Sequence, residues 1–148
     1  MKLLFLLSMV ILCSCGESEQ QKKERLLNEW SGKEIAFPSK ILCLAGEDTI
    51  DYKIPNSDFL VVTYADSLGC ANFKKHYSSW KRLIAKADTL AKKSVSFIFF
   101  LKPSDIDEMR YVLHRGRFDH PVCFDMEDKL HTLNKFPDDP GFRSFLLD

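Results

Sequence analysis

Phe59-Leu-Val-Val-Thr-Tyr64 and Val95-Ser-Phe-Ile-Phe-Phe-Leu101 are nearly continuous apolar runs, rich in β-branched and aromatic residues and bounded by turn residues. Apolar runs without alternation are typical of strands that are buried on both faces, as in a parallel sheet. Residues 71–93, between the two runs, carry apolar side chains at helical intervals and basic side chains on the other side. The sequence therefore predicts a βαβ unit at the centre of an α/β domain.

Downstream of this unit, the sequence predicts further alternation of helices and strands. Pro103-Ser104-Asp105-Ile106-Asp107 combines a proline, a capping serine and an acid three residues later, so a helix should begin there and end near Gly116. A short strand at residues 121–125, a short helix at 128–134 and a last strand at 144–147 complete the domain.

Upstream of the central unit, short extended stretches are broken by turn residues, and this pattern predicts a strand and a hairpin. The stretches are residues 34–37, 41–44 and 49–54. Residues 17–33 begin polar and gain apolar residues at i, i+3, i+4 spacing only near their end, so they predict a polar spacer followed by a short helix.

The first sixteen residues have the features of a secretory signal. Lys2 is followed by an apolar segment and then by Leu12-Cys13-Ser14-Cys15-Gly16, which resembles a bacterial lipoprotein lipobox. The apolar segment is too short to span a bilayer, which needs about 20 residues. The resemblance implies that Cys15 becomes an acylated (palmitate-type) N-terminus and that membrane lipid holds the protein in the cell envelope, outside the cytoplasm. An ordinary signal peptide cleaved elsewhere, or a buried apolar segment, is the alternative.

These observations predict three regions. Residues 1–14 are a lipoprotein signal peptide, and residues 15–33 are a lipidated N-terminus with a polar, partly helical linker. Residues 34–148 are one α/β domain, in which residues 34–58 are an N-terminal strand and hairpin extension.

The full chain has 21 basic and 21 acidic residues. This balance, without a dense basic stripe, argues against nucleic acid as a partner.

Of the five cysteines, Cys13 leaves with the signal and Cys15 would be acylated, so Cys43, Cys70 and Cys123 remain. At most one internal disulfide can therefore form, and at least one cysteine stays odd. We expect Cys43 and Cys123 to pack as small apolar residues within strands, with the alternative that one of them forms a disulfide with Cys70.

The four histidines do not lie at metal-ligand spacing from a cysteine or carboxylate, so we expect no metal site and no cofactor.

The turn after the first central strand is the candidate site, because open α/β sheets bind ligands at the carboxyl ends of their parallel strands. This turn, residues 63–73, places Cys70 at or beside the start of the long helix. Backbone N–H groups at a helix start stabilise a thiolate, so the sequence predicts a lowered pKa for the Cys70 thiol. Lys74, one helical turn later, is the candidate cation for lowering this pKa further, and the favoured interpretation of Lys74 is a solvated helix face. The alternative is a buried cysteine without reactivity.

From Phe59 to its end, the chain resembles the thioredoxin-like superfamily, and more narrowly the lipid-anchored thioredoxin-like (redoxin) proteins of Bacteroides-type bacteria. The strand, the Asp66-Ser67-Leu68-Gly69-Cys70 turn, the long helix and the final Phe145-Leu-Leu-Asp148 carry the resemblance. It implies a thioredoxin-like central sheet flanked by helices. It also implies that Cys70 is the attacking cysteine and that Phe73 occupies the resolving position, which gives a degenerate Cys-x-x-Phe motif. A phenyl ring cannot release a mixed disulfide as a second thiolate does.

Two further departures from the family pattern lie near the end of the chain. Phe142 aligns with the position where the family has a cis-proline, and Pro140 is out of register. The sequence stops at Asp148, so the C-terminal hairpin strand and the closing helix of the family are lacking. One sheet edge and one sheet face would then be uncovered, unless residues 33–54 or a partner cover them.

The resulting prediction is a membrane-anchored extracytoplasmic lipoprotein with, at most, weak single-cysteine thiol-disulfide oxidoreductase activity. Cys70 would form a mixed disulfide with a thiol or disulfide protein partner, or would be oxidised to a sulfenic acid. Substitution of Phe73 by cysteine would then create reductase activity, provided that the geometry of the site is retained. The alternatives are a non-catalytic binding module, whose aromatic-lined turn holds a partner or peptide at the membrane surface, and a truncated, degenerate remnant.

Overall fold

The computed structural model describes residues 16–45, 48–91 and 94–148. The predicted signal peptide and the predicted lipidation at Cys15 lie outside the described residues. The chain divides into two compact units, Met1–Lys33 and Glu34–Asp148. Each unit is described by itself.

The described part of the first unit is a single helix, α2 (Glu19–Trp30). A reciprocal capping box starts it: the Gln21 N–H donates to Ser18 Oγ at 3.2 Å, and the Ser18 N–H donates to Gln21 Oε1 at 2.9 Å. The helix therefore begins within the segment predicted to be a polar spacer, because capping can start a helix before its apolar residues appear. Within the described ranges, no helix is long and apolar enough to cross a membrane.

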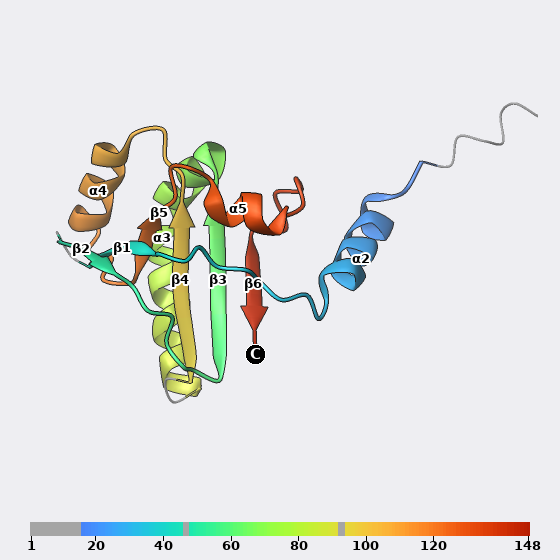
Figure 1. Cartoon of the computed structure of the whole chain (residues 1–148), viewed down its shortest axis with the longest axis horizontal. Coiled ribbons are helices and arrows are strands. Elements are labelled where there is room, and N and C mark those ends of the chain that lie inside the picture. The colour runs from blue at the N-terminus through green and yellow to red at the C-terminus, as the bar shows by residue number, and fades with distance from the viewer. Residues whose placement is uncertain (1–15, 46–47, 92–93) are drawn as a thin grey trace, which may run out of the picture. The chain divides into compact units, whose positions relative to one another are not determined.

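The second unit contains a mixed six-stranded sheet with interleaved helices, so the α/β prediction is confirmed (Figure 1). The strand order is β2-β1-β5-β4-β3-β6. β4 lies between β3 and β5 and pairs with both in parallel. The other three pairs, β1 with β5, β2 with β1 and β6 with β3, are antiparallel. The strands are β1 (Leu42–Ala45), β2 (Asp48–Asp51), β3 (Phe59–Ala65), β4 (Val95–Leu101), β5 (Val122–Phe124) and β6 (Ser144–Leu147).

Three helices connect the strands in the predicted order: α3 (Ser67–Leu90), α4 (Ile106–Arg115) and α5 (Lys129–Asn134). α3 begins four residues before the predicted start, because the Asp66 side chain accepts the Gly69 N–H at 2.8 Å and caps the helix there. The start of α5 is not capped by the side chain of its N-cap residue. Instead, the buried Asp125 carboxylate accepts the N–H groups of Lys129 and Leu130, each at 2.8 Å.

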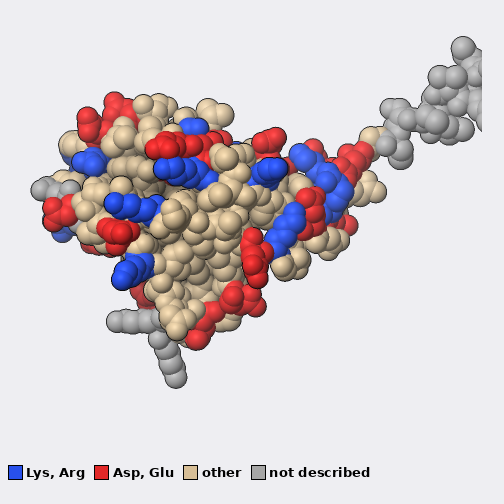
Figure 2. Space-filling view, in the orientation of Figure 1, with Lys and Arg blue, Asp and Glu red and all other residues tan. Residues whose placement is uncertain are grey.

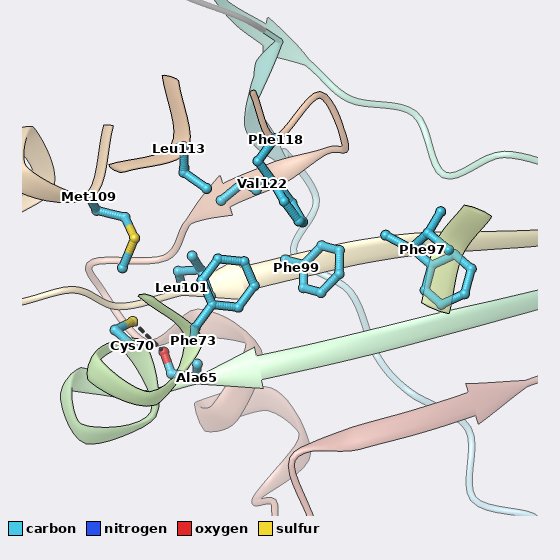
Figure 3. Packing of buried hydrophobic residues seen from close by; sticks show 11 residues of the cluster. Ala65, Cys70, Phe73, Phe97, Phe99, Leu101, Met109, Leu113, Phe118 and Val122 are labelled. Carbon is cyan, nitrogen blue, oxygen red and sulfur yellow. Dashed lines mark hydrogen bonds between the residues drawn. The ribbon is translucent and has the colours of Figure 1, made fainter. Parts of the chain in front are cut away.

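The main core lies on the face of the sheet that α3 and α4 cover, which we call the first face. Edge-to-face aromatic contacts dominate it: the Phe99 ring lies 5.1 Å from Trp80, 5.5 Å from Phe73 and 5.3 Å from Phe118, measured between ring centroids. Met109 and Leu113 of α4 pack into the same cluster (Figure 3). Burial of this aromatic area is the main stabilising contribution on the first face.

The opposite, second face carries the alternate residues of the strands, because side chains alternate along a strand. Tyr64 contacts the rings of His131 and Phe136, and Phe100 contacts Phe37 from the segment before β1. Figure 2 shows acidic and basic side chains interspersed around the rim of this face, with an uncharged area in its middle.

Strands β1 and β2 form the predicted hairpin pair, but they do not lie beside β6. The hairpin extends the sheet beyond β5, whereas β6 forms the opposite edge. Residues 34–37 are extended without being a strand. No peptide bond among the described residues is cis, so the loop before β6 contains no cis-proline.

Cys43 and Cys123 are buried within strands β1 and β5 as expected, but they form a disulfide with each other, which was not expected, and neither bonds to Cys70. They lie directly opposite one another in the β1–β5 register, and both side chains are buried. Cys70 is therefore the odd cysteine, free and buried. The sequence could not show this pairing, because the two cysteines are 80 residues apart and only the sheet topology brings them together.

Candidate functional site

The candidate site is the region where β3 ends and α3 begins. Cys70 is the fourth residue of α3, so it lies in the first turn of the helix as predicted. Its backbone N–H donates to the Asp66 carbonyl at 2.7 Å. The sequence prediction therefore located the sulfur correctly along the chain.

The side chain of Cys70 points into the first-face core rather than toward solvent. It is 2% exposed, and its Sγ donates to the Ala65 carbonyl at 3.4 Å, shown as a dashed line in Figure 3. Leu101 and Met109 belong to the same buried cluster. Burial raises the pKa of the Cys70 thiol to about 11, opposite to the predicted direction.

Several groups modify this pKa, but burial dominates because it disfavours the charged thiolate. The backbone N–H of Lys102 acts to lower the pKa, the negative charge of Asp66 acts to raise it, and Lys74 acts to lower it. Lys74 has the predicted direction of effect, yet its ammonium pairs with Glu108 of α4. The helix start alone does not determine the thiol pKa at this position.

Phe73, the residue at the predicted resolving position, is a core residue. It is 4% exposed, and its ring centroid lies 5.5 Å from that of Phe99 and 5.4 Å from that of Phe118. Figure 3 shows its ring within the same aromatic cluster that extends along β4. Its role in the structure is packing, and no thiol faces Cys70 from this position.

A cleft of about 390 Å³ opens beside the thiol, between the start of α3 and the loop that leads into β6. Its lining combines aromatic rings with hydroxyl, amide, imidazole and charged groups. The residues are Thr63, Tyr64, Ala65, Asp66, Leu68, Gly69, Asn72, Phe73, His76, Trp80, Pro140, Arg143 and Ser144. Cys70 is not among them, although Ala65 and Phe73, which belong to the same buried cluster as Cys70, are.

An ion pair joins the two walls of the cleft. Arg143 Nη2 donates to Asp66 Oδ2 at 2.9 Å, and the Arg143 guanidinium also lies 5.5 Å from the centre of the Tyr64 ring. Asp66 thus binds both the helix start and the loop before β6. On the sheet side, the hydroxyls of Thr63 and Ser144 are 3.0 Å apart.

Behind the cleft, Tyr64 links the end of β3 to α5. Its hydroxyl donates to Asp128 Oδ1 at 2.8 Å, and Lys102 Nζ lies 3.1 Å from Asp128 Oδ2. Burial raises the pKa of Tyr64, and the Asp128 carboxylate raises it further. Burial alone would raise the pKa of Asp128, but its bonds to Tyr64 and Lys102 outweigh burial and lower that pKa. The Tyr64 hydroxyl therefore keeps its proton and Asp128 its charge at neutral pH, and their hydrogen bond helps to position the end of β3.

Sequence reasoning found the turn but missed the cleft. Asp66 could have been identified from the sequence as the N-cap of α3, because aspartate is a preferred residue immediately before a helix. Its side chain accepts the N–H of Gly69, three residues later. Arg143 lies 77 residues from Asp66, and nothing local marks it as a partner. Within the described ranges, no group of three or more His, Cys, Asp or Glu residues could hold a metal ion.

No family model, curated protein or solved structure matches the chain.

Proposed function

We propose that this chain is a membrane-anchored extracytoplasmic lipoprotein whose thioredoxin-like domain is a binding module for an extended peptide segment. The cleft between α3 and β6 is its binding site. In this proposal, the buried Cys70 is a core residue and not an attacking thiol. The observation that carries the proposal is that a cleft with mixed apolar and polar lining adjoins the first turn of α3, while Cys70 of that turn is buried and is not part of the cleft lining.

The thioredoxin-like assignment is supported by the order of the elements. A buried strand, a capped turn with a cysteine in the first helical turn, a long helix, a parallel strand and a late antiparallel strand follow one another as in the resemblance. β6, the counterpart of the family's Phe-Leu-Ile-Asp strand, pairs with β3 from Leu60↔Leu147 to Thr63↔Ser144.

An extended peptide suits the cleft for two reasons. The cleft volume is in the range of binding sites that enclose one or two side chains, and its lining combines apolar surface with a few polar groups. In addition, β6 is an edge strand. Because the Tyr64 N–H bonds to the Arg143 carbonyl, the alternate residues Ser144 and Leu146 present their backbone groups away from β3. An extended peptide can bind to such an edge as an additional strand, through hydrogen bonds to these free backbone groups. Its alternate side chains then enter neighbouring pockets.

The Cys43–Cys123 disulfide supports the extracytoplasmic location. Disulfides persist in oxidising compartments and are rare where thiol reductants keep cysteines reduced. A signal-type N-terminus and a disulfide in the domain are independent features that favour the same compartment.

Peptide selection tests the binding function. A phage library of random linear peptides should yield sequences that bind the wild-type domain, and Asn72→Trp should weaken their binding by at least about tenfold, roughly 1.4 kcal/mol. Asn72 is exposed at the cleft, so an indole there occupies the space that a ligand side chain needs.

Ser78→Trp is the matched control, since Ser78 is exposed on α3 but is not part of the cleft lining. It should bind the selected peptides as tightly as the wild type. Equal binding by both tryptophan variants, or no enriched peptide at all, would refute the assignment of the cleft.

The anchor is tested separately. Cys15→Ala should move the mature protein from the membrane fraction to the soluble fraction, because the acyl chains supply the membrane affinity. Cell fractionation with immunoblotting and metabolic labelling with a fatty acid measure this shift. Cys13→Ala is the control, since it leaves the acylated position intact; an unlabelled, soluble wild-type protein would contradict the anchor.

A further inference from the structure

The N-terminal hairpin, β1 and β2, is joined to the rest of the sheet along a short seam with β5. Two register pairs form this seam, Cys43↔Cys123 and Leu44↔Val122. β2 lies outside β1 at the sheet edge, and all four of its residues are exposed. The disulfide between the first pair of residues is therefore the strongest link between the hairpin and the core.

A solvent-open surface pocket borders the seam on each face of the sheet. On the first face, a pocket of about 180 Å³ is lined by Leu44 and Val122 together with residues of α4 and of the loop after it. On the second face, a pocket of about 160 Å³ is lined by Ile41, Phe100 and Cys123. The side chains of Cys43, Val122 and Cys123 are buried, so the weakness of the seam lies in its length of two register pairs and not in its packing.

We propose that the Cys43–Cys123 disulfide is a redox-controlled latch, which keeps the N-terminal hairpin on the sheet when oxidised and releases it when reduced. The partner is a dithiol reductant protein. This inference is independent of the proposed peptide binding, because the seam lies at the far end of the sheet from β6.

The exchange reaction has a defined direction. Cys123 lines the second-face pocket and is 2% exposed, whereas Cys43 is 0% exposed, so the attack comes from this pocket and on Cys123 Sγ, once local opening at the sheet edge has uncovered that sulfur. A thiolate of the reductant attacks this sulfur, the Cys43–Cys123 bond breaks, and Cys43 leaves as a thiolate that takes up a proton. The second thiol of the reductant then attacks the mixed disulfide, Cys123 leaves and is protonated, and the reductant ends as a disulfide after transferring two electrons.

Release is confined to the hairpin because other contacts hold the preceding segment. The backbone of Ala36 exchanges two hydrogen bonds with the Asn134 side chain, at 2.7 and 2.8 Å, and Phe37 contacts Phe100. A two-stranded hairpin is marginally stable without further support. Its departure would expose the outer edge of β5, which could then pair with another strand.

Hydrogen exchange on the full chain, oxidised and then reduced with dithiothreitol at neutral pH, tests the latch. After reduction, the backbone amides of β1 and β2 should exchange at least about tenfold faster, while those of β3 and β4 stay unchanged. The double variant Cys43→Ser with Cys123→Ser should show the same hairpin-only change without reductant, and Cys70→Ser should not. Unchanged hairpin amides would overturn the proposal. Acceleration across the whole domain would overturn it too, since the disulfide would then be a global staple.

Discussion

At neutral pH, Cys70 in the folded domain should react with a thiol-specific reagent about a hundredfold more slowly than in the urea-unfolded chain. Only the thiolate reacts, and a rise of the thiol pKa from about 9 to about 11 lowers the thiolate fraction by that factor. Burial adds to the protection, because the reagent must reach a sulfur that is 2% exposed. Stopped-flow or mass-spectrometric labelling measures both rates.

The pH dependence of this labelling has a definite sign. The folded-state pKa is raised, so the labelling rate should keep rising as the pH increases toward about 11, instead of levelling off near 9 as in the unfolded chain. By linkage, the unfolded chain loses the Cys70 proton first as pH rises. The buried, protonated Cys70 thiol therefore makes its full contribution to the free energy of unfolding below about pH 9. This contribution is lost as the pH rises toward about 11.

A Cys70→Ala variant is the control for this experiment, since Cys43 and Cys123 are bonded and any remaining signal comes from the N-terminal cysteines. Labelling of the folded wild type faster than that of the unfolded chain would restore single-cysteine chemistry as the leading function. It would mean that the helix start, and not burial, determines the thiol pKa.

Phe73→Cys should destabilise the domain by about 3 kcal/mol, because it removes a buried ring from between Phe99 and Phe118. Urea denaturation followed by tryptophan fluorescence measures the free energy of unfolding. Phe73→Leu is the matched control, and it should cost less since it keeps more of the apolar volume.

The same variant should not gain disulfide reductase activity, although the Cys-x-x-Phe motif would become Cys-x-x-Cys. Cys70 stays buried, and its thiol stays hydrogen-bonded to the Ala65 carbonyl. The Cys-x-x-Cys motif would therefore be restored without an accessible attacking thiolate. A dithiothreitol-coupled reduction assay on a protein disulfide, with Cys70→Ala as the blank, checks this. Activity above the blank in a folded Phe73→Cys protein would show that this site supports thiol exchange.

Much of the fold could be predicted because its signals are local. The runs 59–64 and 95–101 have no polar alternation, and they form β3 and β4, the buried parallel pair at the centre of the sheet. α4 ends at Gly116 as predicted, but Asp105, and not the predicted Ser104, caps its start by accepting the Glu108 N–H. The start of α3 was predicted too late, since apolar periodicity appears only after the residues that Asp66 caps.

The candidate site was predicted only in part. Its place after β3 follows from the general geometry of α/β sheets, and Cys70 does lie in the first turn of α3. Whether a thiol is reactive depends on solvation, and Cys70 is buried in a core cluster whose members include Leu101 and Met109, which lie far along the chain. Arg143 reaches Asp66 only because β6 folds back beside β3.

The α/β alternation, the hairpin before the central strands and the presence of at least one odd cysteine could be predicted from the chain alone, since each depends on neighbouring residues or on a count. The bond between Cys43 and Cys123, the place of β6 beside β3, and the burial of Cys70 next to a cleft became evident only in the folded domain. The physical reason is that disulfide pairing, desolvation and cleft formation depend on residues that are distant in sequence and meet only after the sheet has formed.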